Sequence, residues 1–303
     1  MRQRDPMKIL IAYDGSECSE LAIDDLKRAG LPDRAEAVVL AIAEELYPAP
    51  TSVGGVATTF AKGLLEEEKD SLALARLARS RIRQLFPGWE ILAESGVGSP
   101  GSEIIARADA CGPDLIVVGS HGRTALGRMF FGSVSRRVIN EARCSVRVAR
   151  GRIVEPDVPA RAIVGVDGSK WADAAVVELA SRNWPAGSEV RIVNASWTVP
   201  RATAPGMAVH LAGWVAREKR VKKAVEDAAD KLGSAGLKVS IVVKEREPKA
   251  LLCSEAEDLM ADCIFVGARG MGRLERILIG GVSLGVAARA HCSVEVVRAR
   301  NDA

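Results

Sequence analysis

The chain has 303 residues, of which 48% are hydrophobic and 27% charged, a balance typical of globular proteins with one large or two ordinary domains. Its formal net charge of +3 is too small for the basic surface of a nucleic-acid-binding protein. No apolar run is long enough to span a bilayer, and MRQRDP at the start lacks the apolar core of a secretory signal. The six cysteines have no CxxC or metal-ligand spacing. We therefore expect free thiols in a cytoplasmic protein with neither a nucleic-acid nor a membrane partner.

The first half of the chain alternates between predicted strands and helices. Apolar runs and helical spacing predict, in chain order, a strand at 8–13, a helix at 16–30, a strand at 36–43, a long helix through 65–85, a strand at 90–96, a helix at 102–112 and a strand at 114–119. A glycine-containing segment, a helix and a closing strand at 144–150 complete this half.

The second half repeats the first. Asp-Gly-Ser follows the first strand at residues 14–16 and again at 167–169, and CSVRVAR at 144–150 returns as CSVEVVR at 292–298. Near-continuous apolar strands separated by helices are typical of parallel sheets covered on both faces. The chain is therefore predicted to be an α/β protein with two tandem doubly wound five-stranded parallel-sheet domains, Rossmann-like and related by pseudo-two-fold symmetry. Their predicted bounds are residues 1–152 and 160–303.

The segment VVGSHGRTALGRMFFGSVSRRV carries the main functional signal. Gly119 and Gly122 allow the backbone to turn tightly and to approach a ligand. The helix after Gly132 offers N–H groups and the positive end of its dipole, with Ser133 as the predicted N-cap. A glycine loop facing a helix N-terminus is typical of an anion site, most often for phosphate. The spacing is neither that of a P-loop nor that of a dinucleotide fingerprint.

Asp14 and Asp167 follow the first strand of each half. An aspartate in this position is compatible with ordinary turn chemistry. Both nevertheless fall at the carboxyl edge of the predicted sheet, beside the glycine segment, where doubly wound sheets bind ligands. We favour a ligand contact over a turn residue alone.

The pattern Gly-x2-Gly-x9-Gly-Ser, with Asp14 after the first strand and CSVRVAR at the close, resembles the universal stress protein family in its tandem two-domain form. The resemblance covers essentially the whole chain. The glycine pattern is similar to that of the nucleotide-binding branch, which has an adenine nucleotide α-hydrolase-like fold and binds ATP. The resemblance thus implies ATP as the ligand, with or without Mg²⁺. The first-half contacts that it implies are Ala12, Asp14 and Ile42 near the base and ribose, and Val118, Gly119, Gly122, Arg123, Gly132, Ser133, Val134 and Ser135 near the phosphates. The matching second-half positions are Asp167, Ala195, Gly267, Gly270, Gly280, Gly281, Val282 and Ser283.

The second half departs from the family pattern at Gly281, where the family has Ser or Thr. Glycine keeps the backbone N–H and is a tolerable N-cap. The missing hydroxyl removes one hydrogen bond to a charged oxygen, which is worth about 1.5–3 kcal/mol, or about ten- to a hundredfold in affinity. Ser283 offers a nearby hydroxyl as a replacement, as Ser135 does in the first half. We expect the second site to be weaker than the first or absent.

Three functions remain open. The favoured one is a binding module whose ATP occupancy reports the energy state or stabilises a conformation that a protein partner recognises. The second is an interaction protein with vestigial loops, in which the two domains form an intramolecular pseudo-dimer that pairs again as a homodimer. The third is a slow ATPase in which Asp14 holds Mg²⁺ on the phosphates. No catalytic or metal-ligating residue is assigned, because the sequence shows neither a Ser-His-Asp set nor a metal cluster.

Overall fold

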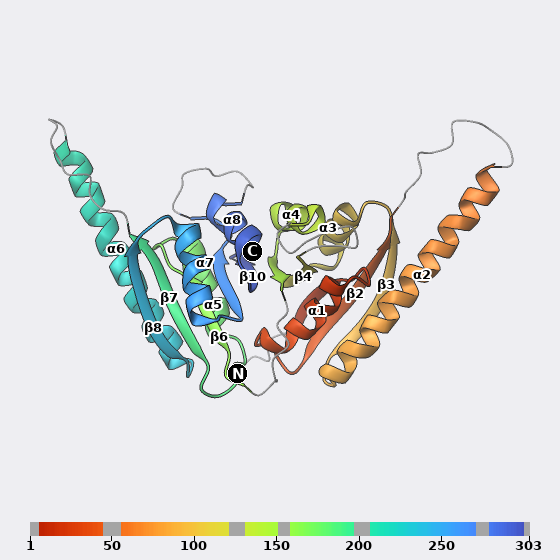
Figure 1. Ribbon diagram of the computed structural model, residues 1–303, viewed down its shortest axis with the longest axis horizontal. Coiled ribbons are helices and arrows are strands. Elements are labelled where there is room, and N and C mark those ends of the chain that lie inside the picture. The colour runs from red at the N-terminus through yellow and green to blue at the C-terminus, as the bar shows by residue number, and fades with distance from the viewer. Residues whose placement is uncertain are drawn as a thin grey trace. The chain divides into compact units, whose positions relative to one another are not determined.

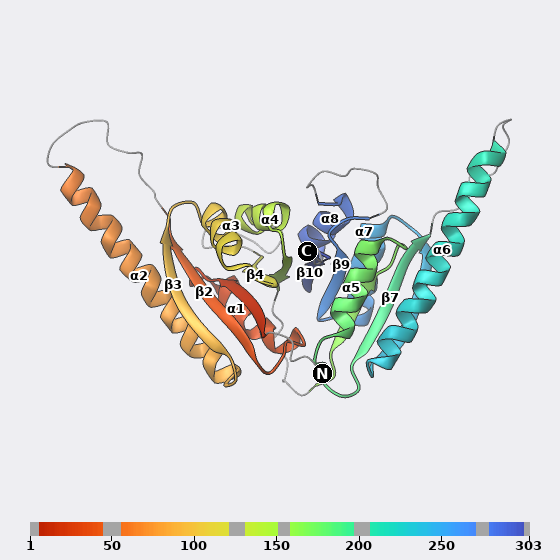
Figure 2. The same cartoon turned by 180° about the vertical axis from the view of Figure 1, so that it is seen from behind.

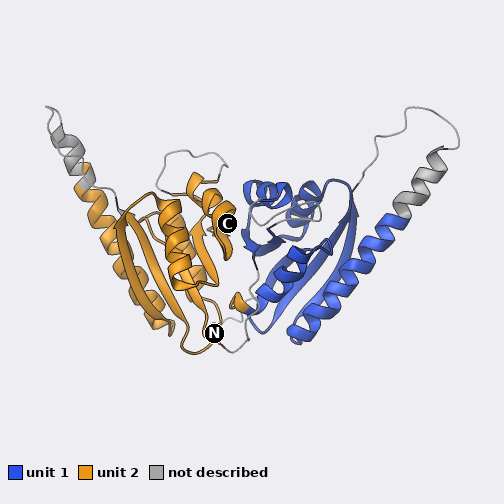
Figure 3. Cartoon of the chain, viewed as in Figure 1, with its two compact units in different colours: residues 1–27, 31–153 blue, residues 28–30, 154–303 orange. Residues whose placement is uncertain are grey.

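The computed structural model describes residues 6–44, 56–120, 131–150, 158–196, 207–270 and 279–299, with the backbone alone at 56–65, 207–212 and 214. The chain forms two compact units (Figure 3), residues 1–27 with 31–153 and residues 28–30 with 154–303. Within the described ranges, no helix combines the length and the apolar character needed to cross a membrane.

The first unit contains a parallel sheet with the strand order β3-β2-β1-β4-β5 (Figure 1). Its elements are β1 (Met7–Ala12), α1 (Glu17–Asp25), the 3₁₀ helix η1 (Leu26–Arg28), β2 (Ala35–Ala43), α2 (Val56–Leu85), β3 (Glu90–Val97), α3 (Pro100–Cys111), β4 (Leu115–Gly119), α4 (Ser133–Glu141) and β5 (Ser145–Ala149). Figures 1 and 2 show α2 lying along β3 from both sides, and α2 also packs on β2. The helix predicted to run to Gly30 ends earlier, because η1 tightens the chain into a 3₁₀ turn before that glycine.

The second unit has the same strand order, β8-β7-β6-β9-β10. Its elements are β6 (Arg161–Gly165), α5 (Lys170–Ala180), β7 (Glu189–Ser196), α6 (Met207–Ser234), β8 (Lys238–Glu245), α7 (Pro248–Leu259), β9 (Cys263–Gly267), α8 (Gly281–Arg289) and β10 (Ser293–Val297). The prediction of two tandem doubly wound parallel-sheet domains is confirmed.

The strand order creates a switch point in each unit. The chain runs from β1 outward to β2 and β3, and then returns to the other side of β1 as β4, with Ile11 paired to Val117. The connections that follow β1 and β4 therefore leave the sheet in opposite directions and open a crevice at its carboxyl edge. In the second unit, β6 and β9 have the same relation, with Ile163 paired to Ile264.

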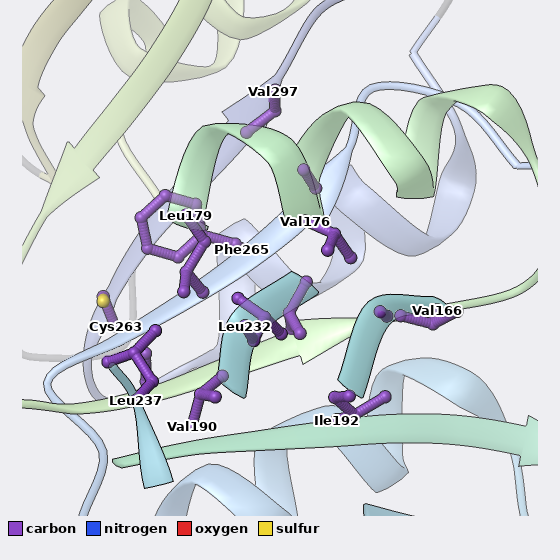
Figure 4. Close-up of a cluster of buried hydrophobic side chains, with 14 of the residues drawn as sticks. Val166, Val176, Leu179, Val190, Ile192, Leu232, Leu237, Cys263, Phe265 and Val297 are labelled. Atoms are coloured by element: carbon purple, nitrogen blue, oxygen red, sulfur yellow. The ribbon is translucent and has the colours of Figure 1, made fainter. Parts of the chain in front are cut away.

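Apolar strands and the inner faces of helices build the cores. Figure 4 shows the core of the second unit, where Leu179 of α5 and Leu232 of α6 join Phe265 of β9, each fully buried. The ring of Trp184 meets that of Phe265 edge to face at 6.2 Å. This packing requires the strand residues to be apolar on both sides, which explains the continuous Val/Ile/Leu runs in the sequence.

The closing strands carry buried charges of opposite sign. Arg147 is the third residue of β5, and its Nε lies 2.6 Å from Oδ2 of Asp25, with both side chains almost fully buried. Glu295 is the third residue of β10 and pairs with the buried Arg182. The duplicated position therefore keeps a buried ion pair but reverses its polarity.

Glu255 of α7 is another buried carboxylate with basic partners. Its Oε1 lies 2.5 Å from Nζ of Lys244 and its Oε2 lies 2.9 Å from Nη1 of Arg191. Burial acts to raise the pKa of Glu255, but the hydrogen bonds from Lys244 and Arg191 outweigh it, and the net pKa lies below the ordinary value. The carboxylate form is therefore the one that the fold stabilises.

Candidate functional site

The turn after β1 is closed by its own side chains. Oδ1 of Asp14 accepts a hydrogen bond from the N–H of Ser16 at 3.0 Å, and Oγ of Ser16 accepts one from the N–H of Ser19 at 3.2 Å, which caps α1. Asp167 and Ser169 repeat the first bond at 3.0 Å in the second unit. Both aspartates thus perform the turn chemistry that is the alternative to ligand binding, and only one carboxylate oxygen of each is needed for it.

The helix α4 begins one residue earlier than predicted. The carbonyl of Gly132 accepts the first bond of the helix, and its N–H donates to the carbonyl of Ser120 at 2.9 Å. Gly132 is therefore the N-cap and Ser133 is the first helical residue, so the prediction of Ser133 as the N-cap is wrong. Gly280 and Gly281 have the same two roles in α8. The N–H groups of the first turn have no partner inside a helix and are the donors that the predicted anion site uses.

Ser135 and Ser283 fasten these helices to the strands. The hydroxyl of Ser135 donates to the carbonyl of Gly119 at 2.6 Å, and that of Ser283 donates to the carbonyl of Gly267 at the same distance. Both serines are 3% exposed. A hydroxyl has one proton to donate. Ser283 therefore has no proton left to replace the hydroxyl that is missing at residue 281.

The glycine at the end of each central strand accommodates a neighbouring helix. A Cβ added to Gly119 would lie 3.1 Å from the carbonyl oxygen of Cys18 at the start of α1. A Cβ added to Gly267 would lie only 2.5 Å from the carbonyl carbon and oxygen of Trp171 at the start of α5. Close packing of helix on strand, in addition to any approach of a ligand, thus requires glycine at residue 267 and favours it at residue 119.

A cavity of about 420 Å³ opens at the switch point of the first unit. It brings together nine of the predicted site residues, namely Ala12, Asp14, Ile42, Val118, Gly119, Gly132, Ser133, Val134 and Ser135. Gly122 and Arg123 lie outside the described residues. The cavity thus joins the turn after β1, the ends of β2 and β4 and the first turn of α4.

Sequence reasoning missed a second group of lining residues. They are Tyr13, Ser19, Leu40, Ala43 and Glu44, with Pro100 and Ile104 of α3 and with Glu67, Asp70, Ser71 and Leu74 of α2. The available signal was a serine within the apolar stripe of the long helix, at residue 71. Helical spacing predicted the long helix but not which part of it faces a cavity; its later part, at Ala75, Ala78 and Ile82, is buried in the core.

The chemistry of the cavity differs from wall to wall. Leu40, Ile42, Leu74 and Ile104 provide apolar surface, which suits the faces of a planar ring. Tyr13 is buried, and burial raises the pKa of its phenol, with Arg81 acting to lower it and Asp14 adding to the rise. The phenol is therefore neutral, and its hydroxyl donates to Glu20.

The second unit arranges its predicted residues differently. A Cβ on Gly270 would lie 2.9 Å from Oδ2 of Asp167, so the loop after β9 passes close to this carboxylate. The Trp171 ring, at the position of Cys18 in the first unit, has the guanidinium of Arg269 5.3 Å from its centre and the ammonium of Lys170 at 4.7 Å. Two basic groups and an indole thus lie where β6 leads into α5 and where the chain leaves β9.

The remaining second-unit positions keep their predicted places. Ala195 lies near the end of β7, beside Lys244 of β8. Val282 lies in the first turn of α8. Across the described parts of both units, no group of three or more His, Cys, Asp or Glu side chains is arranged to hold a metal ion.

A model of the universal stress protein family matches residues 6–150 and matches again over residues 160–298. This chain belongs to the universal stress protein family. Two matches in one chain also confirm the tandem form that the repeat predicted.

Relatives of this chain carry the same family name. Universal stress protein YxiE of Bacillus subtilis is 30% identical over 147 residues, which cover 47% of this chain and 98% of YxiE. Universal stress protein Rv2005c of Mycobacterium tuberculosis is 30% identical over 203 residues, which cover 61% of this chain and 62% of Rv2005c. The match thus spans less than two thirds of the length of this second relative.

Solved structures extend the likeness to the fold of the whole chain. The crystal structure of a universal stress protein from Archaeoglobus fulgidus gives a TM-score of 0.58 at 19% identity and covers 98% of this chain and 97% of its own. At this identity the likeness concerns the fold.

Proposed function

We propose that the first unit binds ATP in the cavity at its switch point and that this universal stress protein is a nucleotide-dependent binding module. The observation that carries the proposal is the cavity itself. A single space of about 420 Å³ is lined by the turn after β1, the ends of β2 and β4, and the first turn of α4. Small-molecule sites of a few hundred Å³ at a switch point are typical of doubly wound sheets.

The phosphates fit the α4 side of the cavity. Gly132, Ser133 and Val134 line it at the start of a nine-residue helix, whose unpaired N–H groups and dipole favour an anion. The hydroxyl of Ser133 adds a donor at the first helical position. Gly122 and Arg123, which the family resemblance assigns to the phosphates, stay part of the proposal on that resemblance alone.

The base and ribose fit the β1–β2 side. Ile42 and Leu40 offer apolar surface for the base, and Ala12 adds little bulk at the end of β1. The second carboxylate oxygen of Asp14 suits a ribose hydroxyl, since carboxylates at this edge of a sheet commonly accept from sugar hydroxyls. Mg²⁺, if bound, would arrive with the phosphates.

The second unit is proposed to be the weaker site. Gly281 lacks the hydroxyl of Ser133, and the hydroxyl of Ser283 is donated to Gly267. Trp171 and Arg269 occupy the edge at which the first unit has Cys18. A titration should therefore show one strong site per chain.

The test begins with the purified protein. We expect denaturation to release adenine nucleotide, and calorimetric titration of nucleotide-free protein with ATP and Mg²⁺ to give one tight site. Gly132→Val should abolish this site without unfolding the protein, because Gly132 has φ −63° and ψ 147°, which valine adopts readily. Gly280→Val is the matched control in the second unit, where an added Cβ meets its neighbours at 3.5 Å, and it should leave the tight site unchanged.

The outcomes separate the proposed function from its rivals. If denaturation releases no nucleotide and millimolar ATP gives no heat of binding, the binding module is refuted and an interaction protein is favoured. Steady phosphate release that disappears in Asp14→Ala would instead identify a slow ATPase. Loss of the tight site in Gly280→Val but not in Gly132→Val would show that this site is not in the first unit.

A further inference from the structure

The helix α2 forms a wall of the first-unit cavity that no predicted residue accounts for. Glu67, Ser71 and Leu74 lie one helical turn apart on the same face, and all three line the cavity together with Asp70. Further along the helix, the same face continues into the core at Ala75. The wall therefore changes from apolar packing to polar groups where it meets the cavity.

The hydroxyl of Ser71 is the unusual group in this wall. Ser71 is 7% exposed and lines the cavity. In the part of the chain that the structure describes, its hydroxyl has no hydrogen-bond partner. Ser80, nine residues further along α2, instead donates to the carbonyl of Arg76 at 2.9 Å, the usual solution for a helical serine. Oγ of Ser71 is not among the fully enclosed polar atoms that lack a partner, so it is open to the cavity, where a ligand or a water molecule can hydrogen-bond it.

The second unit shows that the fold does not need this hydroxyl. The buried residues Ala78 and Ile82 of α2 have the same spacing as Ala228 and Leu232 of α6, and this register matches Ser71 with Val221. Cγ2 of Val221 lies 3.4 Å from the place of a Cβ on Gly168, in the turn after β6. An apolar side chain thus fills this position beside the Asp-Gly-Ser turn without loss of the helix.

The charged residues of the wall also differ between the two units. In the register that pairs Ser71 with Val221, Glu67 and Asp70 correspond to Arg217 and Arg220 of α6. The α2 wall therefore presents hydrogen-bond acceptors to the cavity, and the matching positions of α6 present donors. Only the first kind of wall suits a ligand that carries hydroxyl or amino groups at this end.

The place of α2 in the unit decides which end of the ligand it contacts. α2 packs on β2 and β3, whereas the anion-facing helix α4 follows β4 on the far side of β1. Ser71 therefore lies toward the β1–β2 side of the cavity.

We propose that Ser71 is a ligand-binding residue whose hydroxyl hydrogen-bonds the nucleoside portion of the nucleotide, and that α2 is the wall that selects for donor groups there. This inference rests on the proposed function of the same site. It adds a contact outside the strand ends and the glycine segment, and it gives a second reason why the two units are unequal.

The test is a pair of variants that differ only in the hydroxyl. Threonine and valine have nearly the same shape and similar helix propensity, so Ser71→Thr keeps the donor and Ser71→Val removes it. We expect Ser71→Val to bind ATP about five- to twentyfold more weakly than Ser71→Thr, the loss for one hydrogen bond. The same ratio should appear when adenosine competes with labelled ATP. Ser80→Ala, away from the cavity, is the control and should bind ATP like the wild type.

The unfolding temperatures of the two variants without nucleotide separate a ligand-binding role of the hydroxyl from a structural one. Ser71→Val should unfold at the same temperature as Ser71→Thr or at a higher one, because the described part of the fold gives the hydroxyl no partner whose loss would destabilise it. The reverse order would show that the hydroxyl stabilises the fold, and it would overturn the inference. Equal ATP affinity of the two variants would also overturn it while leaving the proposed function intact. If the two variants differ in affinity for ATP but not for adenosine, the assignment of Ser71 to the nucleoside is refuted. A wild-type protein that binds no nucleotide would refute both proposals.

Discussion

Gly267→Ala is the substitution whose effect follows most directly from the structure. The added Cβ would lie 2.5 Å from the carbonyl carbon and oxygen of Trp171, closer than non-bonded atoms approach in well-packed interiors. These are backbone atoms, so no side-chain rotation can relieve the contact, and α5 must move away from β9. Gly119→Ala is milder, since its Cβ would lie 3.1 Å from the carbonyl oxygen of Cys18. At Gly281 an added Cβ meets nothing within 4 Å.

These distances set an expected order of stability. Overpacking of a core costs about 1–3 kcal/mol, and we assign the upper end to Gly267→Ala and the lower end to Gly119→Ala. For a unit of this size, 1 kcal/mol shifts the unfolding midpoint by about 2–4 °C. Gly267→Ala should therefore lower the midpoint of the second unit by about 6–12 °C, and Gly119→Ala that of the first by about 2–4 °C. Gly281→Ala should leave it unchanged or raise it slightly.

Differential scanning calorimetry measures these midpoints, and hydrogen exchange at the amides of β9 and β4 assigns each transition to its unit. A Gly267→Ala variant that unfolds at the same temperature as Gly281→Ala would refute the argument that helix packing requires the glycine. ATP titration of Gly119→Ala tests whether the glycine is also needed for the approach of a ligand. Loss of binding with unchanged stability would assign that residue to the ligand alone.

Three further predictions concern the second site, a buried ion pair and acid stability. Gly281→Ser restores the missing hydroxyl in open space and should strengthen nucleotide binding by the second unit about ten- to a hundredfold; a titration that still shows one site per chain would contradict this. Arg147→Met removes the guanidinium that pairs with the buried Asp25 and should cost about 3–5 kcal/mol in urea unfolding, whereas Arg147→Met combined with Asp25→Leu should recover part of that loss. The lowered pKa of Glu255 means that its charged form stabilises the fold above its ordinary pKa of 4.5 and that this contribution is lost as the pH falls through the lowered value. Glu255→Gln should therefore show a smaller loss of stability between pH 6 and about pH 3 than the wild type, and an unchanged pH profile would contradict the stated role of Lys244.

The architecture could be predicted from the sequence because its signals are local. Continuous apolar runs, helical spacing and the Asp-Gly-Ser turns each depend on a few neighbouring residues. Because the sequence is duplicated, each predicted element occurs twice, and strands such as 263–267 could be recognised by comparison with their counterparts in the other half. The carboxyl edge of the sheet, and with it the meeting of Asp14 and Gly119, followed from the strand order that such a pattern imposes.

Contacts between residues that are distant in the sequence could not be predicted from local patterns. The bond from Gly132 to Ser120 decides where α4 begins, and no helical pattern contains it. The close contact of Gly119 with Cys18 gives the strand-end glycine a packing role in addition to the one predicted.

The polar wall of α2 shows the same limit. Periodicity predicted the helix but could not place Ser71, because a residue on the inner face of a helix lies either against a sheet or against a cavity, and the pattern is the same for both. Composition and periodicity thus determined the two α/β units and the edge of the sheet at which ligand binding is proposed. Only tertiary packing decided which side chains face the cavity, because that depends on how α2 packs on β2 and β3.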